Sequence, residues 1–154
     1  MKSNNSLRNG LKQVSLLDII SVLFAVLFVY AAMSKLLTYD EFKVQISKSP
    51  LIMKQASWIS WAVPSFEIIV AIMLFIPRLQ MLALYGSFFL MFAFSIYIGF
   101  MLLFVPNLPC SCGGILSKLG WKQHLIFNVV FTILAVIGII LLNRQKRLNK
   151  LIFN

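Results

Sequence analysis

The two cysteines of the chain, Cys110 and Cys112, are separated by one serine and followed by Gly113-Gly114. They stand in a short polar segment between two long apolar runs, where so little side-chain volume adds almost nothing to a packed core. A Cys-x-Cys pair can close a small and strained disulfide ring, and strained disulfides are the more easily reduced ones. The spacing therefore predicts thiol–disulfide exchange, with Cys110 and Cys112 as the exchanging pair.

Three further polar residues can serve this chemistry. His124 and Asn128 lie four positions apart, so they share one face of a helix, and His124 lies toward the same end as the cysteines. We expect His124 to tune the thiols or accept a proton. Glu67 stands inside an apolar run, where a carboxyl group is costly and marks a functional site or a buried pair. We expect Glu67 and Asn128 to be buried polar support; pairing of Glu67 for packing alone is the alternative.

Two thiols can also bind a metal ion or brace a loop. Two thiolates and His124 are acceptable zinc ligands, but a closed structural zinc site takes four ligands and usually a Cys-x₂₋₄-Cys spacing. We therefore predict no metal site, and a static disulfide that braces the loop remains the structural alternative. Because the chain contains two cysteines in all, electrons must be exchanged with a partner outside it. A quinone in the bilayer and the thiols of another protein are the candidates.

The elements that position these residues are membrane spans. Of the 154 residues 60% are hydrophobic and 12% are charged, which indicates an integral membrane protein. A helix needs about 20 apolar residues to cross a bilayer, and four such runs predict spans at 16–37, 58–76, 79–105 and 121–142. We expect a single-domain (1–154), all-α, four-helix transmembrane bundle. Residues 1–15 are expected to form a surface arm, 38–57 amphipathic pieces on the outer interface, and 106–120 the Cys-x-Cys loop.

The basic residues predict the orientation in the membrane. The formal net charge is +10, but the basic residues flank the apolar runs and form no stripe on a soluble domain, which argues against nucleic acid. Eight lysines and arginines fall on the side of the two termini and six on the other side. The positive-inside rule then places both termini in the cytoplasm and the cysteine loop outside, where disulfides persist. Lys35, at the end of the first span, is expected to reach the interface by snorkelling.

The sequence resembles the MauE/DoxX group of small four-helix membrane proteins, and specifically its MauE-like branch. The resemblance rests on Ala31-Ala32-Met33-Ser34-Lys35-Leu36, on Glu67, and on Pro109-Cys110-Ser111-Cys112-Gly113-Gly114 followed by Trp121, His124 and Asn128. It implies a redox-associated protein of the inner membrane that supports disulfide formation or electron transfer for periplasmic partners. By looser analogy it is similar to the quinone-linked thiol oxidoreductases of the DsbB and vitamin K epoxide reductase type, which carry more cysteines.

Two functions follow as expectations. The first is thiol–disulfide redox at the periplasmic face of the bacterial inner membrane, with a periplasmic thiol protein as partner and quinone as candidate cofactor, the latter motivated by Glu67 and the aromatic third span. The alternative is a non-catalytic subunit of a larger membrane complex, in which the disulfide braces a loop.

Overall fold

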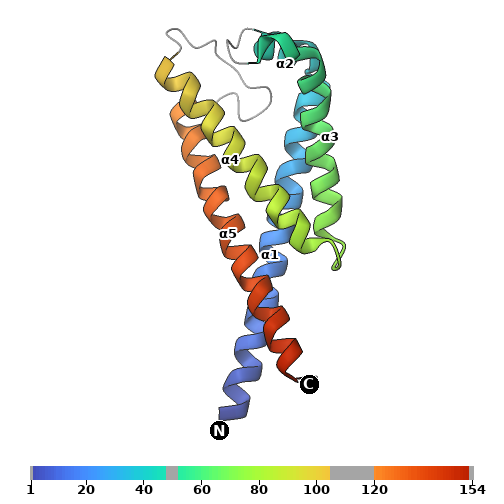
Figure 1. Ribbon diagram of the computed structural model, residues 1–154, viewed down its shortest axis with the longest axis vertical. Coiled ribbons are helices and arrows are strands. Elements are labelled where there is room, and N and C mark those ends of the chain that lie inside the picture. The colour runs from blue at the N-terminus through green and yellow to red at the C-terminus, as the bar shows by residue number, and fades with distance from the viewer. Residues whose placement is uncertain (1, 48–51, 105–119, 153–154) are drawn as a thin grey trace.

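The computed structural model describes residues 2–47, 52–104 and 120–152. They form the helices α1 (Lys2–Leu37), α2 (Tyr39–Ser47), α3 (Ala56–Leu74), α4 (Gln80–Phe104) and α5 (Trp121–Ile152), with one 3₁₀ turn, η1 (Met53–Gln55), ahead of α3. Four segments are long and apolar enough to cross a membrane: Leu16–Leu37, Met53–Leu74, Gln80–Phe104 and Trp121–Leu151. The helical fold and the four predicted spans are confirmed, and the N- and C-terminal ends lie at the same end of the bundle (Figure 1).

The N-terminal segment differs from expectation. Residues 2–15 form no separate arm, because α1 begins at Lys2 and continues into the first span. This stretch contains no proline, and one glycine, Gly10, does not stop a helix that is already nucleated by the span behind it. At the other end of the chain, α5 continues beyond the predicted span through the basic tail to Ile152.

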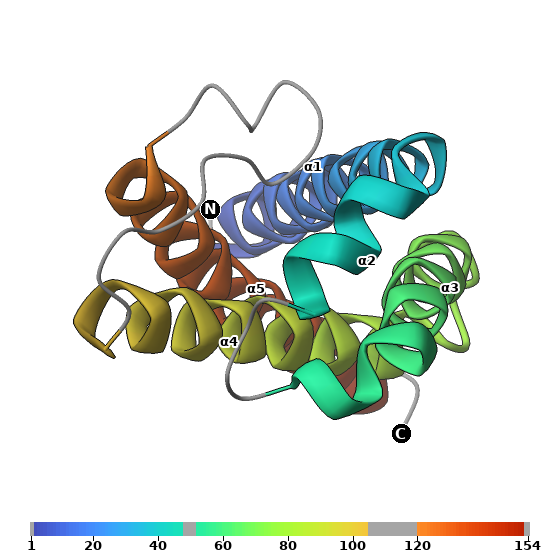
Figure 2. The same ribbon diagram turned by 90° about the horizontal axis from the view of Figure 1, so that it is seen from above.

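The connection between the first two spans contains α2 and η1. Helix α2 begins with Asp40 and Glu41 in its first turn, where negative charge is favourable against the helix dipole. It lies across the end of the bundle that is remote from the termini (Figures 1 and 2). The hydroxyl groups of Tyr39 and Ser60 share a hydrogen bond of 3.1 Å, which ties α2 to α3.

The four spans form two closely packed pairs, α1 with α3 and α4 with α5, and the pairs contact each other through α1 with α5 and α3 with α4. Viewed from above, the four helices surround a common centre below α2 (Figure 2). The turn from α3 to α4 is short: Leu79 donates to the carbonyl of Ile76 at 2.9 Å, around Pro77. This is the tight turn that Pro77-Arg78 predicts.

Small residues set how closely the two pairs approach. A Cβ atom on Gly138 of α5 would lie 3.1 Å from Leu84 Cδ2 and 3.4 Å from Ile20 Cγ2, and one on Gly86 would lie 3.1 Å from Val70 Cγ2. These glycines sit beside the buried core, which includes Phe24, Phe28 and Leu84. The pairs are therefore in close contact in the half of the bundle near the termini, and they diverge toward α2 (Figure 1).

The outer surface of the spans is apolar. Each span exposes large hydrophobic side chains, for example Val26, Ile69, Phe89 and Ile133. A soluble protein would hide such a surface, whereas a bilayer solvates it. The chain is thus a multi-pass membrane protein.

Candidate functional site

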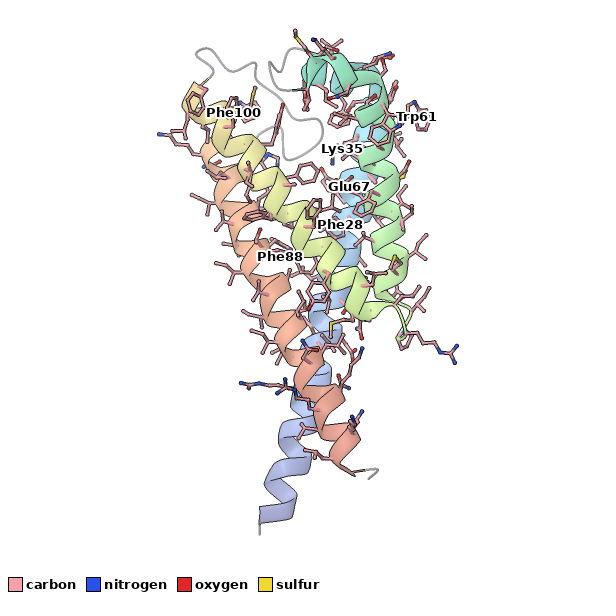
Figure 3. All side chains as sticks on the ribbon, viewed as in Figure 1. Phe28, Lys35, Trp61, Glu67, Phe88 and Phe100 are labelled. Carbon is pink, nitrogen blue, oxygen red and sulfur yellow. The ribbon has the colours of Figure 1, made fainter. Side chains whose placement is uncertain are left out.

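An ion pair lies inside the bundle between α1 and α3. The ammonium Nζ of Lys35 is 2.7 Å from Oε1 of Glu67, and the Glu67 side chain is 1% exposed while that of Lys35 is 19% exposed. Figure 3 shows the two side chains pointing toward each other in the half of the bundle nearer to α2. A buried charge needs a partner, and this pair supplies one for each residue.

The helix periodicity explains why these two side chains face inward. Lys35 follows Phe28 and Ala32 on the buried stripe of α1 at spacings of three and four residues, and Glu67 follows Pro64 on the stripe of α3 in the same way. Lys35 was expected at the interface, because a lysine at the end of a span can snorkel. Its position on the buried stripe was the signal that would have assigned it to the bundle interior.

The ion pair leaves polar atoms unpaired. In the part of the chain that the structure describes, Oε2 of Glu67 and Oγ of Ser34 are buried and have no hydrogen-bond partner. The Lys35 ammonium donates to Glu67 Oε1 and, at 3.3 Å, to the carbonyl of Ala31, so these two bonds use two of its three N–H groups. The site therefore offers one cationic donor and two acceptors at one place.

Aromatic rings surround the Lys35 ammonium. Its Nζ lies 5.6 Å from the ring centroid of Phe94 on α4 and 5.9 Å from that of Phe42 on α2. Both distances are within the range of a cation–π interaction, which partly replaces the hydration that the ammonium loses. Residues of three different helices thus hold this one charged group.

The ion pair lines a cavity of about 330 Å³ below α2, where the two helix pairs diverge. Residues of all five helices form its wall, and most of them are apolar or aromatic. Its polar lining residues are Tyr30, Ser34, Lys35, Gln45, Glu67, Tyr97, His124 and Asn128. A mostly apolar cavity of this size with a few convergent polar groups is typical of a small-molecule site.

The start of α5 fixes where His124 enters the cavity. The carbonyl of Gly120 accepts the backbone N–H of His124 at 3.0 Å, and the side-chain oxygen of Gln123 accepts the backbone N–H of Gly120 at 3.2 Å. The second bond is the reciprocal half of a capping box, which satisfies a donor at the helix start. One turn later Asn128, 2% exposed, donates to the carbonyl of His124 at 2.9 Å.

The structure therefore brings Glu67, His124 and Asn128 together around one cavity and adds Lys35 and Ser34, which sequence reasoning missed. Cys110 and Cys112 lie outside the described residues, as do Pro109 and the two glycines after them. Their neighbours in the described part are Phe104, which ends α4, and Gly120, which precedes α5. No three His, Cys, Asp or Glu side chains gather as metal ligands within 2–47, 52–104 and 120–152.

Comparison with known proteins identifies the family. The family model described as methylamine utilisation protein MauE matches residues 13–141, which include the first three spans and most of the last. No curated protein and no solved structure matches the chain. The cavity residues Lys35, Glu67, His124 and Asn128 all fall within the matched part. The chain belongs to the MauE family, that of the methylamine utilisation membrane protein MauE.

Proposed function

We propose that this protein is a thiol–disulfide redox protein of the bacterial inner membrane, which acts at the periplasmic face through Cys110 and Cys112. The observation that carries the proposal is the position of the cavity. It lies at the same end of the bundle as Phe104 and Gly120, the two points between which the cysteine-bearing segment runs. In this proposal the thiol pair acts at the end of the molecule that holds its buried polar residues.

The N-terminus of α5 supports a reactive thiol pair. It follows the cysteine segment directly, and it carries Lys122 in its first turn. A helix N-terminus and a nearby cation both favour a thiolate over a thiol, and the thiolate is the nucleophile in exchange. In this proposal His124, in the same first turn, accepts or returns the thiol proton. Asn128, on the same face of α5, and Glu67, on the opposite wall of the cavity, are buried polar support.

The electrons and protons of the exchange are balanced between this protein and its partner, and no other reactant is needed. A thiolate of the pair attacks one sulfur of a partner disulfide, the partner S–S bond breaks, and a mixed disulfide forms with release of a partner thiolate. The second thiol of the pair then attacks the mixed disulfide, which yields the Cys110–Cys112 disulfide and a reduced partner. The reverse sequence oxidises the partner. Exported proteins of methylamine utilisation are the first partners to examine, because the family is named for that process.

Single cysteine variants test this function, because the variant that keeps the attacking thiol and lacks the second one stops the exchange at the mixed disulfide. We expect Cys110→Ser or Cys112→Ser to accumulate a covalent adduct with an exported protein, visible on a non-reducing gel and identified by mass spectrometry. The double variant gives no adduct, and Ser111→Ala, which keeps both thiols, behaves as the wild type.

The competing function, a structural subunit with a loop-bracing disulfide, gives a different result. In that case neither single variant forms an adduct, and alkylation of intact membranes finds Cys110 and Cys112 in one unchanging redox state. The double variant would still copurify with its complex. That combination would show that the thiol pair is not a redox centre.

A further inference from the structure

The cavity contains buried polar atoms that have no hydrogen-bond partner among the described residues. Oε2 of Glu67 and Oγ of Ser34 accept no hydrogen bond from the described residues, and both atoms are buried. A buried carboxylate oxygen without a donor costs more than an unpaired neutral group. Glu67 Oε2 therefore calls for a donor, and the third N–H of Lys35 is available for an acceptor.

These requirements restrict the occupant. The charges of Lys35 and Glu67 cancel within a 2.7 Å pair, so a neutral head group fits better than an anion such as a phosphate, which would face the Glu67 carboxylate. Aromatic residues from four helices line the cavity, including Phe42, Phe94, Trp121 and Phe127, and they suit a flat ring. The walls belong mainly to membrane spans and to α2, which favours an occupant that is soluble in the bilayer.

We propose that this cavity binds the head group of a lipid-soluble quinone and of its reduced form, the quinol, with Lys35 and Glu67 as the polar contacts. A quinone carbonyl accepts a hydrogen bond from Lys35. A quinol hydroxyl donates to Glu67 Oε2, so each redox form has a partner in the same ion pair. The Ser34 hydroxyl accepts or donates a further hydrogen bond to the same head group.

The role of the bound quinone as an electron acceptor rests on the proposed thiol function, whereas its binding does not. Oxidation of two thiols to one disulfide releases two electrons and two protons, and reduction of one quinone to one quinol takes up the same number of each. The cavity then connects the thiol pair to the bilayer pool.

Binding is measured on the full chain in nanodiscs of phosphatidylcholine that contain no quinone. Trp58 and Trp61 face outward, so Trp58→Phe/Trp61→Phe leaves Trp121, in the cavity wall, as the fluorophore. We expect decylubiquinone to quench Trp121 saturably, and to do so equally in the Cys110→Ser/Cys112→Ser background. Binding in that background tests the inference alone, and the mixed-disulfide experiment tests the function alone.

A steric variant keeps the charges in place. Ala93 on α4 lines the cavity, where Ala93→Phe adds bulk, whereas Ile96→Phe adds bulk at an exposed position of the same helix that does not line it. We expect at least a tenfold loss of quinone affinity in Ala93→Phe and no change in Ile96→Phe. Glu67→Gln should weaken the quinol more than the quinone, because its amide is a poorer acceptor than a carboxylate.

Two results would overturn the inference. One is quenching that is unsaturable, or saturable with equal affinity in Ala93→Phe. The other is native mass spectrometry that shows a phospholipid retained by the wild type, displaced in Ala93→Phe and unaffected by excess decylubiquinone.

Discussion

Lys35 in the last turn of α1 and Glu67 in the middle of α3 form an ion pair of 2.7 Å that joins the two helices connected through α2. Removing one member leaves the other charge buried without its partner. For Lys35→Met we therefore expect the free energy of unfolding to fall by about 3–5 kcal/mol, the usual cost of breaking a buried pair. Replacing both, as Lys35→Met/Glu67→Leu, should restore most of it.

This prediction is checked by SDS unfolding of the reconstituted protein, followed by circular dichroism. Glu41→Gln, which removes an exposed carboxylate in the first turn of α2, is the matched control and should cost less than about 1 kcal/mol. If Lys35→Met were no more destabilising than Glu41→Gln, the ion pair would not hold α1 to α3.

Gly138 of α5 packs against Leu84 of α4. Gly138→Ala places a Cβ 3.1 Å from Cδ2 of Leu84, which is fully buried, and 3.4 Å from Cγ2 of Ile20. We expect a loss of about 1–3 kcal/mol in unfolding free energy, the range for overpacked cores. Gly99→Ala on α4 has no heavy atom within 4 Å of the new Cβ and should be neutral or slightly stabilising. Equal midpoints of SDS unfolding for the two variants would contradict this.

The spans and the inward faces of Glu67 and Asn128 could be predicted from the sequence, because run length and helix periodicity are local properties. The inward position of Lys35, which allows its pairing with Glu67, also follows from helix periodicity, since Lys35 continues the stripe of Phe28 and Ala32. It was not predicted because a lysine at the end of a span can instead snorkel to the interface. The predicted span 121–142 covers the apolar part of α5, and the helix continues through the basic tail because charge ends a membrane span without ending a helix.

The cavity itself could not be predicted in this way. It exists because glycines such as Gly138 bring the pairs together at one end, and because α2 crosses the other end, where the pairs diverge. Both are properties of packing between elements distant in the sequence. The polar residues can be identified in the sequence, but only the arrangement of the helices shows that they line the same cavity.

The hydrogen bond between Tyr39 and Ser60 is expected to keep α2 over the cavity. Tyr39→Phe removes that bond of 3.1 Å and preserves the ring contact with Trp61, at 5.5 Å between centroids. A hydrogen bond contributes about 1 kcal/mol, so local opening of residues 39–47 should become roughly fivefold more frequent. Hydrogen–deuterium exchange with mass spectrometry measures this. Tyr85→Phe, on the exposed face of α4, is the control, and equal exchange in α2 for both variants would rule out the anchoring role.

The orientation of the bundle can be tested with reporter fusions. The turn that contains Arg78 lies at the same end as both termini, so the three must share one side of the membrane (Figure 1). With that side cytoplasmic, green fluorescent protein fused after Arg78 or Asn154 should fluoresce, and alkaline phosphatase fused after Gly120 should be active. The opposite pattern would place the thiol pair in the cytoplasm, where disulfides do not persist.

The tail is expected to determine much of this orientation, because short basic segments next to a span are retained in the cytoplasm. Four of the eight basic residues on the terminal side are in the tail: Arg144, Lys146, Arg147 and Lys150. Changing these four to glutamine leaves four basic residues against six on the other side. We therefore expect a fraction of the fusions after Asn154 to invert, which raises phosphatase activity and lowers fluorescence. Changing Lys43, Lys48, Lys54 and Lys118 to glutamine instead should leave the fusions as in the wild type. An equal response to both sets would mean that the apolar spans, and not the tail charges, set the orientation.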